Sequence, residues 1–189
     1  LTVGTDVSVG KMFTALAIES EMKRRNIDAD FRATGQTGIF IAGSGVSIDA
    51  VVADFISGAV EWLCPENDPN HWDIVEGQGS LFNVSYAGVS LGLIHGSQPD
   101  AIVVCHEAGR PHMRSMPHFP LVDLPTCIEA NLQAARLTNP NVFCVGAAIN
   151  TSGLSEADGR VFCEKIAGEI GLPVVDPLRD GVALLVDQI

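Results

Sequence analysis

Positive charge is scarce in this chain. Only 11 of its 189 residues are Lys or Arg, against 23 Asp and Glu, so the formal net charge is −12. Proteins bind nucleic acids through a surplus of basic side chains, and this balance therefore argues against a nucleic-acid partner. It also requires that any anionic ligand be held by local groups, because the overall field of the protein would repel it.

Other features are also missing. No apolar run approaches the length of a membrane span, and no stretch has the basic start and apolar centre of a secretory signal. The five cysteines form no CxxC pair. These absences predict a cytoplasmic protein with no membrane partner, whose cysteines are reduced, buried and inert.

The residues that are present predict an α/β fold. Hydrophobic residues make up 47% of the chain, enough for a full core. Apolar strand patterns alternate with helical ones, which indicates a parallel sheet with helices on both faces, a three-layer sandwich of the P-loop NTPase type. Strands are expected at 1–3, 29–34, 72–75, 101–105, 142–149 and 173–175, and helices at 11–26, 50–63, 87–95, 124–137, 155–170 and 181–186.

The chain begins without Met, inside its first expected strand. We therefore expect residues 1–189 to form one P-loop-type α/β domain that is the C-terminal part of a longer protein. No pattern specifies the oligomeric state, and our expectation is a homo-oligomer.

The first strand leads into a segment with the layout of a phosphate-binding loop. A glycine follows the strand, and Gly10-Lys11 opens the helix, so backbone N–H groups and a lysine charge would face an anion. The next residue is Met12, where a nucleotide hydrolase has a Ser or Thr that binds Mg²⁺. The loop is therefore expected to hold phosphates without a metal. The predicted cofactor-binding residues are Gly4, Thr5, Asp6, Val7, Ser8, Val9, Gly10, Lys11 and Met12.

Polar residues follow three other strands, at the sheet edge where ligands of parallel α/β proteins bind. Glu76 ends the strand 72–75 and could accept a proton, bind a metal or orient Lys11. Gly77 and Gln78 come next, and Thr34 and Gln36 follow the strand that contains Arg32. Asn150 ends the strand 142–149.

The segment 106–123 is unusually long for a loop in a compact domain, and such loops are often functional. Its His106, His112 and His118 recur every six residues, a spacing that matches no common zinc motif, so no metal is expected. Imidazole also suits general-base work near neutral pH. Arg110 and Arg114 could bind carboxylates in bidentate fashion.

These motifs resemble a known family. The segments are Gly4–Met12, Asp30–Gly38, Asp49–Phe55, Glu76–Leu81 and His95–Asp100. Together they resemble the D-glutamate (D-amino-acid) N-acetyltransferases, a P-loop family long catalogued without a function, and the similarity runs through the whole chain. The P-loop and Glu-Gly motifs alone resemble the wider dethiobiotin synthetase-like class.

The resemblance implies acetyl transfer from acetyl-CoA to the amine of D-glutamate, and a Rossmann-like N-terminal domain that precedes the P-loop domain. Coenzyme A carries a diphosphate that a P-loop could hold. Because acyl transfer breaks no phosphoanhydride bond, Met12 would then be no defect.

The roles within that reaction are our own hypotheses. Glu76 or His106, with Asp6 third, would deprotonate the amine. Backbone N–H groups of Gly77 and Gly79, or the Asn150 amide, would stabilise the oxyanion. Arg32, Arg110 and Arg114 are the candidates for the substrate carboxylates. An acyl-enzyme on Cys105 stays open, as do two other functions: an ATP- and Mg²⁺-dependent ligase or kinase, and a nucleotide-binding module without catalysis.

Overall fold

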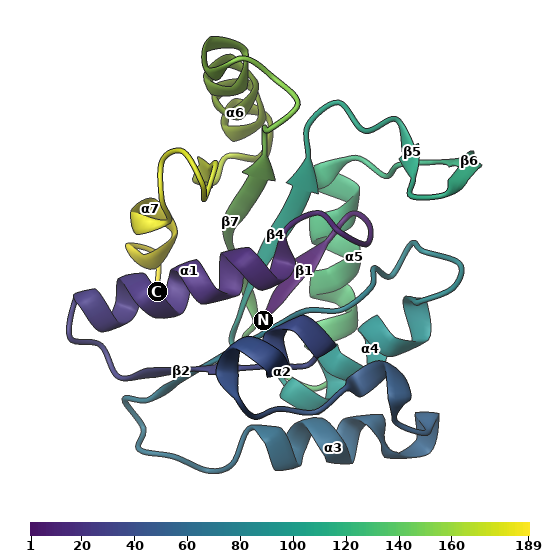
Figure 1. Cartoon of the computed structure of the whole chain (residues 1–189), viewed down its shortest axis with the longest axis vertical. Helices are drawn as coiled ribbons and strands as arrows, with labels where there is room; N and C mark the ends of the chain where they lie inside the picture. Colours follow the sequence, from purple (N-terminus) through teal and green to yellow (C-terminus); the bar gives the residue numbers. More distant parts are fainter.

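The computed structural model describes all residues 1–189, and a parallel sheet lies at its centre (Figure 1). The sheet contains β1 (Thr2–Gly4), β4 (Ala101–Glu107), β7 (Phe143–Asn150) and β8 (Val174–Val175) in the order β1-β4-β7-β8. Each neighbouring pair is parallel, as the continuous apolar runs predict. The carboxyl ends of β1, β4 and β7 therefore lie at one edge.

Two further strands stay outside this sheet. β2 (Ala29–Arg32) and β3 (Trp72–Val75) pair with each other in parallel. A hydrogen bond to a side chain links this pair to β1: the backbone N–H of Gly77, just beyond β3, donates to Thr2 Oγ1 at 2.9 Å. A cleft of about 270 Å³ is lined by β3 on one side and by Leu1 and the first half of β4 on the other. The expected continuous sheet is thus split at this point.

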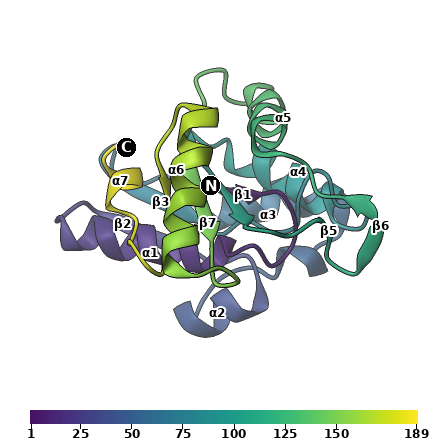
Figure 2. The same ribbon diagram turned by 90° about the horizontal axis from the view of Figure 1, so that it is seen from above.

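Helices cover both faces of the sheet, which confirms the three-layer sandwich (Figure 2). α1 (Lys11–Arg24) and α7 (Ala183–Val186) lie on one face, where Ile18 and Leu185 pack in one cluster with Val103 and Cys105 of β4. On the other face are α4 (Ala87–Ser97), α5 (Leu124–Arg136) and α6 (Glu156–Ile170). Side chains alternate along a strand, so Ile102 and Val104 face this second cluster.

The expected helix 50–63 is wrong in its first half. Two short 3-10 turns, η1 (Ile48–Ala50) and η2 (Ala53–Phe55), precede α3 (Ile56–Leu63). Between them Val51 and Val52 have extended backbone angles. Two consecutive β-branched residues favour that conformation over a helix. A further short helix, α2 (Gln36–Ala42), follows β2 directly and was not expected.

The long segment after β4 is partly ordered as a hairpin. β4 itself continues to Glu107, and β5 (His112–Met113) then pairs with β6 (Met116–Pro120) in antiparallel fashion. In Figure 1 this hairpin projects from the same end of the sheet as the loop that follows β1.

Helix starts and thiols match expectation more closely. The Ser155 hydroxyl accepts from the Asp158 N–H at 3.1 Å and begins α6 as a cap. All five cysteines are free, with Cys105, Cys127 and Cys163 buried and the other two half-buried. No helix of the chain has the length and apolar character needed to cross a membrane.

Candidate functional site

The segment between β1 and α1 has the conformation of an anion-binding loop. Gly10 adopts a φ of 106°, in the region that favours glycine, and turns the chain into α1. The backbone N–H groups of Val9, Gly10, Lys11 and Met12 donate to no atom of the protein. Unpaired N–H groups at a helix N-terminus are the donors that a phosphate accepts from.

Lys11 supplies the charge of this loop. Its side chain is buried, and Nζ donates to the Asp6 carbonyl oxygen at 2.8 Å, which leaves two of its three protons free. Burial lowers the pKa of the ammonium, and the negative charge of Asp6 opposes that effect. An anion bound next to Lys11 would compensate for the lost solvation.

The side chain of Asp6 connects the loop between β1 and α1 to three other residues. Its fully buried carboxylate accepts hydrogen bonds from the Arg114 N–H at 2.6 Å, Asn83 Nδ2 at 2.9 Å and the Arg110 guanidinium at 3.0 Å. Burial raises the pKa of Asp6, but these hydrogen bonds and the Arg110 charge outweigh it and leave the pKa below its ordinary value. A carboxylate held ionised in this way is a poor general base, which disfavours that predicted role for Asp6.

Replacing Asp6 tests this structural role. Asp6→Asn should lower the free energy of unfolding by about 3 kcal/mol, because the Arg110 charge loses its fully buried partner and keeps only the half-buried Glu107. Since the pKa of Asp6 is lower in the folded state, its contribution is present above its unfolded value of 3.8 and is lost as the pH falls through the folded value. Urea unfolding should therefore show the gap between wild type and variant narrowing below about pH 4.

The matched control for that experiment is Asp54→Asn, which changes an exposed carboxylate that makes no ion pair. Its unfolding free energy should stay within about 0.5 kcal/mol of wild type. Equal stability of Asp6→Asn and wild type at pH 7 would contradict the structural role of Asp6.

Glu76 is buried at the end of β3 and contacts the start of α2. Its Oε2 accepts from the Thr34 N–H at 2.9 Å and the Gly35 N–H at 3.0 Å, which fixes the carboxylate against the helix N-terminus. The other oxygen, Oε1, accepts no hydrogen bond from the protein. Lys11 makes no ion pair with Glu76, so the hypothesis that Glu76 orients Lys11 is wrong. One fixed and one free oxygen suit a group that accepts a proton.

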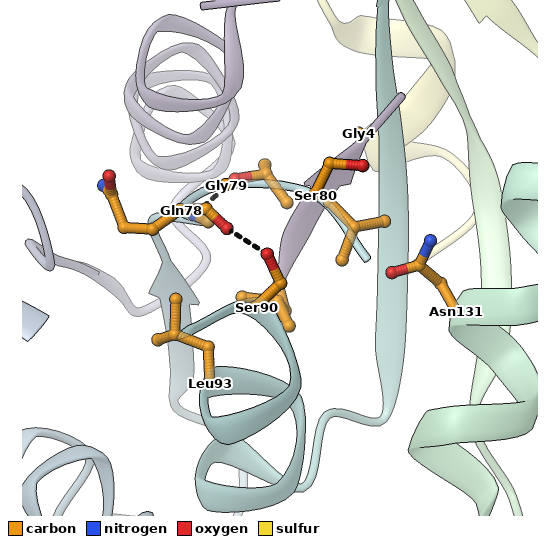
Figure 3. Close-up of a pocket in the computed structure, with 11 residues that line it drawn as sticks. Gly4, Gln78, Gly79, Ser80, Ser90, Leu93 and Asn131 are labelled. Atoms are coloured by element: carbon orange, nitrogen blue, oxygen red, sulfur yellow. Dashed lines mark hydrogen bonds between the residues drawn. The ribbon is translucent and has the colours of Figure 1, made fainter. Parts of the chain in front are cut away.

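The residues after Glu76 cross over β1 (Figure 3). Gly77 approaches β1 so closely that a side chain there would collide with the Thr2 carbonyl oxygen. Its N–H is already bonded to Thr2 Oγ1, so Gly77 cannot serve as an oxyanion donor. Ser90 Oγ donates to the Gln78 carbonyl at 2.8 Å and fixes the loop from α4. The cavity enclosed here holds only about 10 Å³, room for at most one water molecule.

The ligand-sized space lies on the outer side of this loop. The P-loop hollow, about 430 Å³ in volume, is open to solvent and lies between the Val7–Phe13 segment and the Glu76–Gly79 segment, with Asn150 at one end. It is lined by Val7, Ser8, Gly10, Lys11, Met12, Phe13, Glu76, Gly77, Gln78, Gly79 and Asn150. Sheet-edge residues predicted from separate motifs thus share one space.

A second space, which we name the hairpin hollow, adjoins the first at Val7, Ser8, Gln78 and Gly79. Its volume is about 460 Å³, and the β5–β6 hairpin contributes Arg114 to its wall. The Arg114 guanidinium forms no ion pair or hydrogen bond within the chain. It is therefore a cation without a bonded partner beside the P-loop hollow, and Asp49 is the one acidic residue that lines the same space.

The other two predicted arginines are occupied. Arg32 Nε donates to Asp73 at 2.5 Å within the β2–β3 pair. Arg110 bonds Asp6, the Val7 carbonyl at 2.8 Å and the Glu107 carboxylate. Neither lines a hollow described here, so we assign Arg32 and Arg110 structural roles.

Thr34 and Gln36 flank Glu76 from the α2 side. The buried Thr34 hydroxyl donates to the Glu76 carbonyl oxygen at 2.5 Å and accepts from Gln78 Nε2 at 3.2 Å. Gln36 is the first residue of α2 and lines none of these spaces. Thr34 therefore acts on the hollow through Glu76 and Gln78.

His106 lies on the other side of the sheet. It shares the β4 face of Ile102 and Val104, and its ring stacks on Phe162 of α6 with centroids 6.3 Å apart. Its Nδ1 is 3.1 Å from Thr5 Oγ1. Burial and the positive charge of Arg110 lower the pKa of His106, which keeps it neutral at pH 7. His106 lines neither hollow, and its contact with Thr5 supports the P-loop from behind.

Cys105 is also poorly placed for chemistry. Its side chain is fully buried on the α1 face, where Sγ lies 3.5 Å from Thr14 Oγ1. Burial raises the pKa of the Cys105 thiol to about 11, so the thiolate is rare at neutral pH. The acyl-cysteine alternative is therefore disfavoured. No three His, Cys, Asp or Glu side chains come together in an arrangement that could hold a metal ion.

This combination of a parallel sheet, a glycine-lysine loop and free N–H groups at the start of α1 defines a P-loop domain. Residues 1–186 match the family described as "Domain of unknown function (DUF1611_C) P-loop domain", and the chain belongs to that family. This match confirms the membership of a P-loop family that the sequence motifs predict.

Two curated relatives carry a functional name. The chain is 59% identical over 186 residues to a D-glutamate N-acetyltransferase of Pseudoalteromonas, a match that covers 98% of this chain and 56% of that protein. It is 50% identical over 189 residues to a protein of the same name from Tritonibacter scottomollicae, covering 100% of this chain and 57% of the relative. The chain thus spans little more than half the length of these relatives.

Solved structures agree on the fold. A DUF1611 family protein from Anabaena variabilis superimposes with a TM-score of 0.94 at 38% identity, covering 99% of this chain and 55% of that one. Cobyrinic acid a,c-diamide synthase from Mycobacterium smegmatis, solved with ADP and magnesium, gives a TM-score of 0.55 at 12% identity, covering 98% and 91%. The second likeness shows the shared fold alone.

Proposed function

We propose that the chain transfers an acetyl group from acetyl-CoA to the amine of D-glutamate or a closely related D-amino acid. The observation that carries the proposal is the P-loop hollow, which joins a phosphate-binding loop without a metal-binding hydroxyl to a carboxylate with one free oxygen. The two curated relatives named D-glutamate N-acetyltransferase support it.

The P-loop would hold the diphosphate of coenzyme A. Lys11 and the unpaired N–H groups of Val9, Gly10 and Met12 point to an anion at the start of α1. Met12 lines the hollow where a hydrolase places its Mg²⁺-binding hydroxyl. No phosphoanhydride bond breaks in acyl transfer, so this loop needs to bind phosphates but not to activate them.

Glu76 would act as the general base. The acceptor amine is protonated at pH 7 and must lose a proton before its nitrogen attacks the thioester carbon. Oε1 of Glu76 takes that proton while Oε2 stays bonded to Thr34 and Gly35. As the C–N bond forms and the C–S bond breaks, the electron pair leaves on the sulfur of coenzyme A.

The developing oxyanion needs a donor in the same hollow. Of the two backbone candidates, only the Gly79 N–H remains after Gly77 is excluded, and it donates to no atom of the protein. The Asn150 amide, which also lines this hollow, is the other candidate left from the sequence. Gly79 has a φ of 63° and lines both the P-loop and the hairpin hollows. A fixed backbone donor of this kind stabilises charge where it appears in the transition state.

A direct assay tests the proposal. The purified protein, acetyl-CoA and D-glutamate should release coenzyme A in step with N-acetylglutamate, followed by a thiol reagent and by mass spectrometry. L-Glutamate tests the stereochemistry, and ATP with Mg²⁺ tests the ligase or kinase alternative. Turnover of ATP without acetyl transfer would contradict the proposal, and so would coenzyme A binding with no transfer to any amino acid.

Arg114 should decide affinity for the acceptor. Arg114→Ala removes the free guanidinium of the hairpin hollow, so the KM for D-glutamate should rise about 10- to 100-fold with little change in kcat. The backbone bond from Arg114 to Asp6 is unaffected by the substitution. Arg114→Lys should recover part of the affinity, because it restores the charge without the bidentate geometry.

Arg160→Ala is the matched control, since Arg160 is an exposed arginine on α6 whose only partner is Glu156. Its KM should equal that of wild type. If Arg114→Ala left the KM for D-glutamate unchanged, another group would bind the substrate carboxylates.

A further inference from the structure

A third space opens beside the P-loop, on the side away from the hairpin. The apolar hollow, about 240 Å³ in volume, lies between the start of α1 and the segments that follow β7 and β8. Phe13 and Thr14 form one wall, and Pro177 and Leu178 form the opposite one. An apolar cavity of about 150 Å³ accommodates a benzene ring, so this space can take a larger flat heterocycle.

The walls of the apolar hollow expose hydrophobic surface to solvent. Phe13 is 45% exposed and Leu178 is 74% exposed. Asp176, the one acidic residue in the wall, is buried and accepts from both the Thr151 N–H and hydroxyl and from the Leu178 N–H. The hollow therefore presents an aromatic ring and aliphatic side chains without a free charge.

One polar group remains available there. Asn150 Oδ1 accepts from the Ser152 N–H at 3.0 Å, which fixes the amide orientation, while Nδ2 donates to no atom of the protein. A fixed amide donor beside an aromatic wall suits a heteroaromatic base that has ring nitrogens as acceptors.

The apolar hollow adjoins the phosphate site. It shares Gly10, Phe13 and Asn150 with the P-loop hollow, and it shares no residue with the hairpin hollow. A ligand whose diphosphate lies at Lys11 therefore has two exits, an apolar one past Phe13 and a polar one past Gln78 towards Arg114.

We propose that the apolar hollow binds the adenosine end of coenzyme A, with Phe13 against the base and Asn150 Nδ2 donating to it. This assignment rests on the proposed function, and it fixes the direction in which acetyl-CoA lies across the two hollows. The pantetheine arm runs the other way, past Glu76 and Gly79, so that the thioester meets the acceptor next to the hairpin hollow.

Kinetics with two different acetyl donors test this assignment. Acetyl-CoA carries the adenosine end, whereas acetyl-4′-phosphopantetheine keeps the thioester and one phosphate but lacks it. Phe13→Ala and Asn150→Ala should each raise the KM for acetyl-CoA about tenfold, the scale of a lost base–aromatic stack. The KM for acetyl-4′-phosphopantetheine should stay within about twofold of wild type. Phe143→Ala, at the opposite end of β7 and 41% exposed, is the matched control for both donors.

Binding of ADP without magnesium, measured by calorimetry, gives a readout that needs no turnover. ADP should bind wild type, and Phe13→Ala should weaken that binding about tenfold while Phe143→Ala leaves it unchanged. The assignment would be overturned if Phe13→Ala and Asn150→Ala raised the KM equally for both acetyl donors, or raised only the KM for D-glutamate. It would also be overturned if Phe13→Ala left the binding of ADP unchanged. Absence of acetyl transfer from either acetyl donor would refute the proposed function instead. The ADP titration would then still test whether the apolar hollow binds an adenosine group.

Discussion

Lys11→Met should raise the KM for acetyl-CoA by roughly 30-fold to several-thousand-fold, the equivalent of about 2–5 kcal/mol for the loss of one partner of a buried charge pair. The reason is geometric: Lys11 is the only cation that lines the P-loop hollow. The KM for D-glutamate should change little, because its carboxylates are expected at Arg114 in the neighbouring hollow.

The fold should survive this substitution. Lys11 is buried and makes one hydrogen bond, to the Asp6 carbonyl oxygen, so an apolar side chain of similar length removes a desolvated charge. Lys23→Met is the matched control, since Lys23 lies in the same helix and its side chain is 52% exposed. Steady-state kinetics with both substrates provide the measurement. An unchanged KM for acetyl-CoA in Lys11→Met would show that the diphosphate binds elsewhere.

Glu76→Gln should lower kcat by about 10²- to 10⁴-fold, the usual range for loss of a general base. The amide oxygen of Gln can still accept from the Thr34 and Gly35 N–H groups, so α2 keeps its anchor and both KM values should stay near wild type. A fall in kcat without a rise in KM would separate a chemical role from a structural one.

Two companion variants make this result decisive. Glu61→Gln changes an exposed glutamate of α3 and should leave kcat unchanged. His106→Ala, at the competing base, should lower kcat far less than Glu76→Gln, because His106 stacks on Phe162 on the opposite face of the sheet. If His106→Ala abolished turnover and Glu76→Gln did not, the base would be misassigned.

Local patterns in the sequence were sufficient for the P-loop. A strand, a glycine turn and Gly10-Lys11 lie next to one another in the chain, so their geometry is set by neighbouring residues. The position of Glu76 was predictable for a similar reason, since it directly follows the buried strand β3. Parallel strands then bring their carboxyl ends to one edge, and the motifs meet there.

The predictions that failed depend on contacts between distant segments. The sequence predicts that Arg110 binds a ligand, but its side chain bonds Asp6 more than 100 positions earlier in the chain. No local sequence pattern predicts that ion pair, or the hydrogen bond that Asn83 donates to the same carboxylate. The fate of Arg32 depends on Asp73 in the neighbouring strand, which is equally non-local.

The placement of His106 was accessible to a closer reading of the sequence. Alternation along β4 puts residue 106 on the face of Ile102 and Val104, and residues 103 and 105 on the face that α1 covers. The extent of the β4 strand decided the matter, because it continues through His106 to Glu107 and carries the alternation to the end of the sheet.

The central claim is that the loop between β1 and α1 holds the diphosphate of coenzyme A with its bonds intact. A crystal structure of the protein with coenzyme A tests it most directly. The account predicts diphosphate oxygens within hydrogen-bond distance of Lys11 Nζ and of the N–H groups of Gly10 and Met12, with no metal ion between them. Coenzyme A bound at another site, with the loop free of phosphate, would contradict the account.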